Sequence, residues 1–265
     1  MYKILSYYIT MKNDDYNIVI AVVIFIIFIY FVTSLVEWCL HYFVMHKNIF
    51  KLLNVKSKKE QYDYHLEHHI KTYLTQYNKG PENELVFDIF SIHVISLSSI
   101  LLIIFSICWF IIPHFKYCIP FKIYILTVIF AILFYYWCWG SLHSRYHNRK
   151  IKMSNQIAYN LVPYFTPDVN SPIYKYLFTY HSLHHLNKGE SKGNYNIICP
   201  LFDHIFQTYT PRVDNTLHFS KNKPKTKQEE WLSKNLVFDI RVFDNNQLRY
   251  KLENSNEWVP FPDDI

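Results

Sequence analysis

The sequence predicts an all-α integral membrane protein with about three to four transmembrane helices, a cytoplasmic helical cap that carries histidine-rich segments, and a small polar C-terminal tail. Three observations support this fold class. The 265 residues are 51% hydrophobic, yet their mean hydropathy is −0.03, so very apolar stretches alternate with very polar ones. Lysine and arginine flank the apolar stretches, and histidines recur beside them at helical spacing.

The first apolar stretch, Ile18 to Val36, contains no charged residue. Its length of about nineteen residues matches a bilayer core of roughly 30 Å at 1.5 Å per residue. We expect a spanning helix that ends a first segment, 1–36. A cleaved signal peptide is disfavoured, because the apolar core of such a peptide is shorter and a small-residue cleavage site follows it.

The second and third stretches form a predicted membrane hairpin within 85–140. The second, Leu85 to Ile112, is apolar after Asp88 and His93, and the third, Ile119 to Gly140, contains one charge, Lys122. Three spans are therefore the minimum. The second stretch is long enough to include a bend or a re-entrant piece, which would give the fourth.

Positive charge predicts the orientation of these spans, because cytoplasmic flanks are enriched in lysine and arginine. Such residues follow the first and third stretches, whereas the connector between the second and third has only Lys116 and Lys122. The flanking residues are Lys47, Lys51, Lys56, Lys58, Lys59, Arg145, Arg149, Lys150 and Lys152. Both histidine-rich segments are then cytoplasmic and the N-terminus lies on the opposite side. Anionic lipid headgroups account for the net charge of +6, and no nucleic-acid motif is present.

Ten of the fourteen histidines fall into four groups. They are His41 and His46, then His65, His68 and His69, then His143 and His147, and then His181, His184 and His185. Residues three and four apart lie on one face of a helix, so each HxxHH triplet can converge on one ion. His41 and His46 fit less well, because they lie about 140° apart on an ideal α-helix. These two are expected to flank a helix end or to bind different ions.

Neutral imidazole suits zinc, iron, copper and nickel, and ten ligands are too many for one ion. We therefore expect two ions with about five histidines each, or four and a water. Three alternatives remain: solvated surface histidines without metal, a purely structural zinc site, and a metal transporter. The transporter predicts polar residues in the centres of the spans, which contain almost none. The single histidines His93, His114, His204 and His218 are expected to have no metal role.

The four groups in this order resemble the histidine boxes of the fatty acid hydroxylase / sterol desaturase superfamily of membrane di-metal enzymes. The segments Lys188–Asn196 (KGESKGNYN) and Pro200–Phe206 (PLFDHIF), followed by Thr208, are similar to elements after the last box in many members. The likeness covers about Glu37 to Tyr209. It departs at Phe202, where tryptophan is common, and at Asn196, where many members have glycine.

This resemblance implies an O2-dependent oxidoreductase that hydroxylates a fatty acyl, sphingolipid or related lipid, with all ten histidines as ligands of two iron ions. Zinc is the alternative occupant in purified protein. The chain has no HPGG heme motif, so a separate electron donor, such as cytochrome b5 or a reductase, is implied, together with the endoplasmic reticulum in a eukaryotic host. The spacing of the first box is more similar to hydroxylases than to sterol desaturases. A sterol-type desaturase and an inactive or structural metal-binding membrane protein are the alternatives.

The predicted domain order is therefore 1–36, a hydroxylase-like domain at 37–210, and a hydrophilic tail at 211–265. Within the tail, the pattern LVFDIRVF, DNN, QLRYKL predicts a small β-hairpin.

Overall fold

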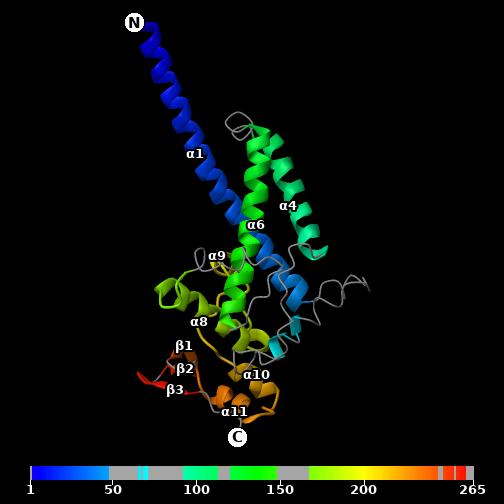
Figure 1. The fold of residues 1–265 in the computed structure, drawn as a ribbon. Coiled ribbons are helices and arrows are strands. Elements are labelled where there is room, and N and C mark those ends of the chain that lie inside the picture. Colours follow the sequence, from blue (N-terminus) through cyan, green and yellow to red (C-terminus); the bar gives the residue numbers. More distant parts are fainter. Residues whose placement is uncertain are drawn as a thin grey trace. The chain divides into compact units, whose positions relative to one another are not determined.

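A computed structural model describes residues 2–47, 65–66, 68–70, 92–112, 120–147, 167–243, 247–253 and 255–260. These residues are mostly helical (Figure 1). The chain divides into two compact units, which are described separately: Met1–Leu35 with Asp88–Trp137, and Val36–Phe87 with Cys138–Ile265.

The first unit contains most of α1 (Tyr2–Cys39), helix α4 (Ile92–Ile111) and the first part of α6 (Phe121–Tyr146). Its core is aromatic. Phe25 stacks on Tyr124 with ring centroids 4.2 Å apart, and Phe105 meets Phe25 edge-on at 6.5 Å. The Tyr124 hydroxyl donates to the Phe105 carbonyl at 2.7 Å, so the one polar atom of this ring is satisfied inside the unit.

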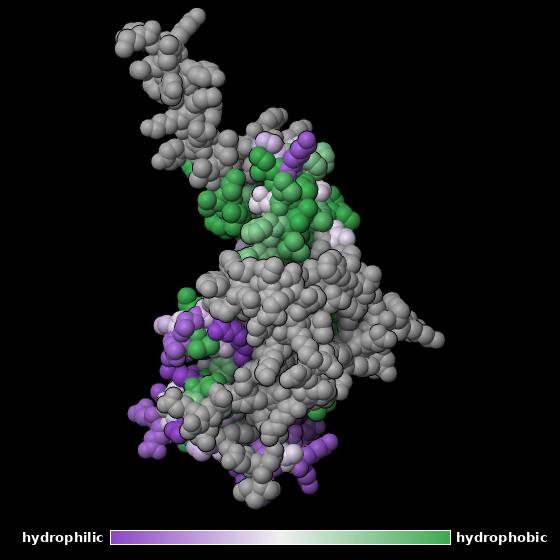
Figure 2. All heavy atoms as spheres, in the orientation of Figure 1, coloured by the Kyte–Doolittle hydropathy of each residue, from purple (hydrophilic) through white to green (hydrophobic). Residues whose placement is uncertain are grey.

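Many large apolar side chains of this unit are exposed among the residues that the structure describes, and Figure 2 shows hydrophobic side chains gathered over α4 and α6. Exposed members include Ile103, Ile107 and Phe110 on α4, and Leu126 and Phe130 on α6. One helical stretch among the described residues, Val22–His46, is long and apolar enough to cross a membrane, and Leu101–Ile111 and Phe121–Tyr135 are shorter apolar helices. An apolar surface of this kind is typical of membrane or partner contact.

The predicted hairpin agrees in part with these helices. Residues 85–91 and 113–119 lie outside the described part of the chain. Helix α6 does not end at Gly140, as the apolar stretch does, but continues to Tyr146. Helical hydrogen bonds do not depend on the polarity of side chains, and a single glycine costs only about 1 kcal/mol inside a helix. The number of spans and their orientation stay predictions.

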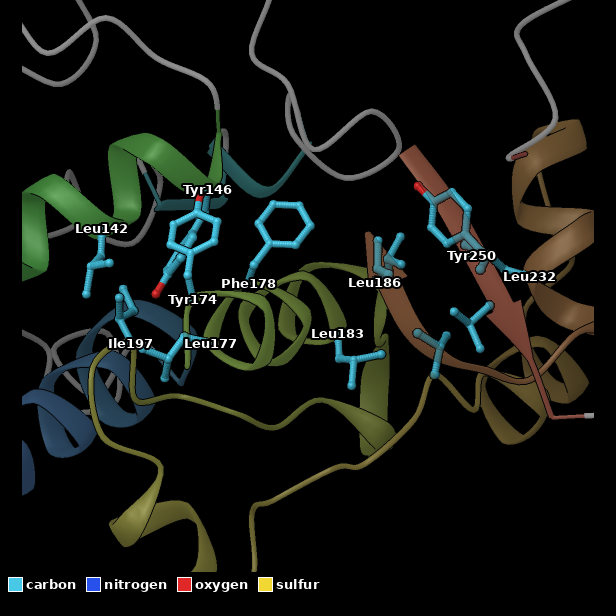
Figure 3. Close-up of a cluster of buried hydrophobic side chains, with 13 residues drawn as sticks. Leu142, Tyr146, Tyr174, Leu177, Phe178, Leu183, Leu186, Ile197, Leu232 and Tyr250 are labelled. Atoms are coloured by element: carbon cyan, nitrogen blue, oxygen red, sulfur yellow. The ribbon is translucent and has the colours of Figure 1, made fainter. Parts of the chain in front are cut away.

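The second unit is built around α8 (Pro172–Leu186). Ser171 caps this helix by accepting a hydrogen bond from the backbone nitrogen of Tyr174 at 3.1 Å, and Pro172 occupies the first turn, where its missing N–H costs nothing. Tyr174, Phe178 and other side chains of α8 pack in a buried cluster with Leu142 and Tyr146 of α6 (Figure 3). This cluster holds α8 against the end of α6, and both helices bear histidines.

The chain after α8 forms short helices and a sheet in the same unit. The helices are η3 (Gly189–Ser191), α9 (Leu201–Ile205), α10 (Thr216–Lys221) and α11 (Lys227–Lys234). The strands β1 (Val237–Phe243), β2 (Gln247–Leu252) and β3 (Trp258–Pro260) form one antiparallel sheet in that order.

The predicted hairpin in the C-terminal segment is confirmed as β1 and β2, whereas β3 was not predicted. Segment 211–265 is more than a polar tail, because Leu232, Ile240 and Tyr250 belong to the same buried cluster as α8 (Figure 3). The Thr179 hydroxyl of α8 lies 2.8 Å from Asp239 Oδ1 and 3.0 Å from the Ile240 carbonyl oxygen, which fixes the helix to β1.

Candidate metal centre

A π-helix places the first two histidines on one face. After α1, residues Leu40–His46 form η1, and the amide of Lys47 donates to the Tyr42 carbonyl, five residues back, at 2.9 Å. Residues five apart are neighbours on such a turn, whereas they diverge on an α-helix. The ring centroids of His41 and His46 are therefore only 4.9 Å apart. The expectation that they flank a helix end is wrong, because both lie within η1.

Five histidines from three segments form the first histidine group. Their ligand atoms all lie within 4.8 Å of one another. The members are His41, His46, His65, His69 and His184. The Nε2 atom of His65 lies 3.1 Å from that of His41, 3.1 Å from that of His46 and 3.0 Å from that of His69. One imidazole nitrogen has either one N–H or one lone pair, so ordinary hydrogen bonds cannot satisfy all three contacts. A shared cation can.

Backbone carbonyls determine the tautomers of two members. His41 Nδ1 donates to the Tyr195 carbonyl, and His184 Nδ1 donates to the Gly193 carbonyl at 2.6 Å. In a neutral imidazole, an Nδ1 that donates leaves a lone pair on Nε2. The Nε2 atom of His184 faces those of His46 and His69 at 3.2 and 3.1 Å. Lone pairs thus point into the group, as a bound metal ion requires.

A second histidine group lies beside the first. Four members have ligand atoms within 4.8 Å of one another: His68, His143, His147 and His185. His181 joins them, because its Nε2 atom lies 3.0 Å from those of His147 and His185. The rings of His69 and His185 stack with centroids 4.2 Å apart, so the two groups adjoin. All ten histidines predicted as ligands are thereby brought together in two sets of five, and their role as ligands stays a prediction.

Each HxxHH triplet is split between the groups. His65 and His69 belong to the first group and His68 to the second, whereas His181 and His185 belong to the second and His184 to the first. The structure does not bring each triplet together as one ligand set, and the reason is geometric. Residues four apart differ by about 40° around a helix, while the intervening histidine points about 60 to 100° away from them.

Burial favours the neutral form of five of these imidazoles. It lowers the pKa of His65, His69, His181, His184 and His185 well below the usual value, and neighbouring histidines lower it further. Lys192 adds positive charge near the first group. Burial, and then the nearby Lys188, lowers the pKa of Lys192 to about 8. Neutral, buried lone pairs favour a metal ion over a proton.

Two buried carboxylates, Glu37 and Asp203, support the Gly193–Ile197 segment, here called the carbonyl segment, whose carbonyls hold His41 and His184. Asp203 accepts from the Tyr195 amide at 2.9 Å and from the Asn196 amide at 2.8 Å. Glu37 accepts from the Ile197 amide at 2.9 Å and from Asn196 Nδ2 at 3.1 Å. The sequence predicted no role for either carboxylate, although Asp203 lies in the PLFDHIF segment that resembles an element after the last histidine box. Glu37 precedes His41 by one helical turn, which is the only sign of it in the sequence.

Asp203 is also the centre of a wider network. The Tyr180 hydroxyl donates to it, as do Thr208 Oγ1 at 2.6 Å and Trp38 Nε1 at 3.2 Å. At Gly193 the backbone approaches closely, because a Cβ there would lie 2.1 Å from the Thr208 carbonyl oxygen. Only glycine fits this position without a shift of the main chain.

The single histidines behave differently. His204 lies exposed on α9 and His218 partly exposed on α10, and neither belongs to a histidine group. His93 lies in the first turn of α4, its side chain is outside the described part of the chain, and His114 lies wholly outside it.

No protein-family model, no curated protein and no solved structure matches the chain. The likeness to fatty acid hydroxylases and sterol desaturases rests on the histidine groups and the segments that follow them. What the structure adds is two adjoining, buried histidine groups that could hold metal ions.

Proposed function

We propose that the chain is an O2-dependent, lipid-modifying oxidoreductase that hydroxylates a C–H bond of a fatty acyl, sphingolipid or related lipid at a pair of histidine-bound iron ions. The observation that supports this most is the pair of adjoining groups, which contain histidine alone. A transporter needs a row of polar sites along a path, whereas these donors are concentrated in one buried place.

The donor set fits two metal ions. Five converging imidazoles per group match the ligand type that iron and zinc accept. The tautomers of His41 and His184 direct Nε2 inward, and burial lowers the pKa of His65 and His69, which favours their neutral form. The first ion would be held by His41, His46, His65, His69 and His184, and the second by His68, His143, His147, His181 and His185.

Iron bound there would supply the redox chemistry, in which one C–H bond, one O2, two electrons and two protons give an alcohol and water. The protein orients the ligands and excludes water from the metal centre. Carbonyls of the carbonyl segment orient two imidazoles, and aromatic rings cover the first group: the Tyr195 ring lies 5.7 Å from His41 and 5.5 Å from His184 between centroids. Trp38 stacks on Tyr42 at 4.9 Å beside them.

The proposed setting is a membrane. Three to four spans would place the histidine groups on the cytoplasmic side, in the endoplasmic reticulum of a eukaryotic host, where a lipid enters from the bilayer and cytochrome b5 or a reductase supplies electrons. The exposed apolar side chains of α4 and α6 support contact with lipid. A sterol-type desaturase would use the same centre but remove a second hydrogen instead of returning oxygen.

The test is lipid oxidation by the full chain, loaded with iron in lipid nanodiscs and supplied with O2 and a cytochrome b5 reducing system. We expect a product heavier by one oxygen atom that takes up label from 18O2. A His68→Ala, His184→Ala variant, which removes one ligand from each group, should form none, and the control His218→Ala should retain activity. Two bound irons without oxidation of any acyl, sphingoid or sterol lipid would contradict the proposal.

A further inference from the structure

Glu37 and Asp203 lie behind the first histidine group, not in it. Between them they accept three successive backbone amides of the carbonyl segment, those of Tyr195, Asn196 and Ile197. Two carbonyls of the same segment, those of Tyr195 and Gly193, accept from His41 and His184 of the first group. Asp203 holds the Asn196 amide, which belongs to the same peptide unit as the Tyr195 carbonyl, and Glu37 holds the amide of the next unit.

Glu37 has a particular place in this arrangement. It lies near the end of α1, four residues before His41, so both side chains project from one face of the chain. Its Oε1 atom accepts from the Ile197 amide at 2.9 Å, two residues beyond the carbonyl that holds His41. One side chain thus connects the helix that bears a ligand to the segment that orients it.

The chemistry of the contacts explains why carboxylates are used. Glu37 is 9% exposed and Asp203 is not exposed at all, so each charge needs several donors. Hydrogen bonds from amides to an ionised carboxylate are shorter and stronger than those between neutral groups. A segment held in this way keeps its carbonyls fixed while an imidazole gains or loses a metal ion.

We propose that Glu37 and Asp203 are positioning residues that set the metal affinity of the first histidine group. The inference rests on the proposed metal centre. It adds that the affinity for the first-group ion depends on this carboxylate pair, whereas the affinity for the second-group ion does not. Glu37 is the sharper probe, because it connects the helix that bears His41 to the carbonyl segment, whereas Asp203 also accepts from Tyr180 of α8, a helix that bears ligands of both groups.

The experiment titrates Co2+ into the metal-free full chain in detergent, with elemental analysis and a competing chelator. Wild type should bind two ions, and Glu37→Gln should weaken one of them by about 10- to 100-fold, the usual effect of losing an outer partner of a ligand. In the Glu37→Gln background, His185→Ala should remove the remaining tight ion and His184→Ala should not. The control is Glu229→Gln, which removes a carboxylate paired with Lys188 in the same unit and should leave both ions tight.

Retention of one tight ion also shows that the variant is folded. Two unchanged affinities, or equal weakening of both, would overturn the inference. If Glu37→Gln does not fold, Thr208→Val removes one hydroxyl donor of Asp203 and should weaken one ion alone, and an unchanged pair of affinities would then refute it. Absence of Co2+ binding by wild type would instead overturn the metal centre itself.

Discussion

Replacing Lys192 with methionine should stabilise the protein. The Lys192 ammonium is partly buried and forms no hydrogen bond or ion pair with any side chain in the described part of the chain. Burial and the nearby Lys188 lower the pKa of Lys192 from 10.5 to about 8. This difference corresponds to about 3 kcal/mol at 1.36 kcal/mol per pKa unit. Methionine keeps most of the hydrocarbon volume and removes the charge, so up to about 3 kcal/mol of stability should be gained.

The dependence on pH identifies the cause. Below pH 8 both folded and unfolded Lys192 are protonated and the full cost of burial is present. Between the folded value of about 8 and the unfolded value of 10.5 the unfolded chain binds more protons, so the wild type gains stability as pH rises. The advantage of Lys192→Met should therefore be constant below pH 8 and shrink above it.

Thermal unfolding of the metal-free full chain in detergent, followed by tryptophan fluorescence at pH 7 and pH 10, measures this difference. About 3 kcal/mol corresponds to a rise in Tm of roughly 6 to 12 °C at pH 7. The control is Lys188→Met, which breaks the 2.6 Å pair with Glu229 and should not stabilise. A Lys192→Met protein that is less stable than wild type, or an advantage that is the same at both pH values, would refute the reasoning.

Three further outcomes are expected. Deleting Phe43 should convert η1 to an α-helix that keeps its two histidines on one face, so two ions should remain bound. Inserting an alanine after Phe43 should turn the two histidines to different faces and release the first-group ion. Equal metal content in both variants would contradict the role of the π-helix. Gly193→Ala should cost about 1 to 3 kcal/mol in unfolding free energy and weaken the first-group ion in a chelator titration, because its Cβ would lie 2.1 Å from the Thr208 carbonyl oxygen. Metal-free protein should lose stability as pH falls below about 6.5. The pKa values of His65, His69 and His184 are lowered in the folded protein, so the unfolded chain binds more protons in this range. An unfolding free energy that stays constant from pH 7.5 to 5 would count against the burial of these histidines.

The spacing of histidines in the sequence was enough to find the residues of both groups, because helical periodicity is a local property. The spacing did not predict how these residues divide between the two groups. The triplets were expected to act as units, but an arc of about 100° can reach two adjoining groups as easily as one. The interval of five between His41 and His46 was judged against an α-helix, whereas these residues lie in a π-helix, where residues five apart are neighbours.

The contact of Glu37 with the carbonyl segment could not be predicted from the sequence for a different reason. Glu37 and Ile197 are 160 positions apart, and nothing in either segment states that they meet. The β1 and β2 hairpin was predictable from alternation over six or seven residues, but β3 has only three, too few for a pattern. The packing of α8 against the C-terminal sheet also depends on long-range contacts, such as that of Thr179 with Asp239. No local sequence pattern encodes these contacts.

Iron content per chain, measured by elemental analysis on the iron-loaded, detergent-purified full chain, tests the two-ion centre most directly. Wild type should contain two irons. His184→Ala, which changes the first group, and His185→Ala, which changes the second, should each retain one, and the variant with both changes should retain none. One iron or none in folded wild type, or loss of both irons on changing either histidine alone, would contradict two separate sites.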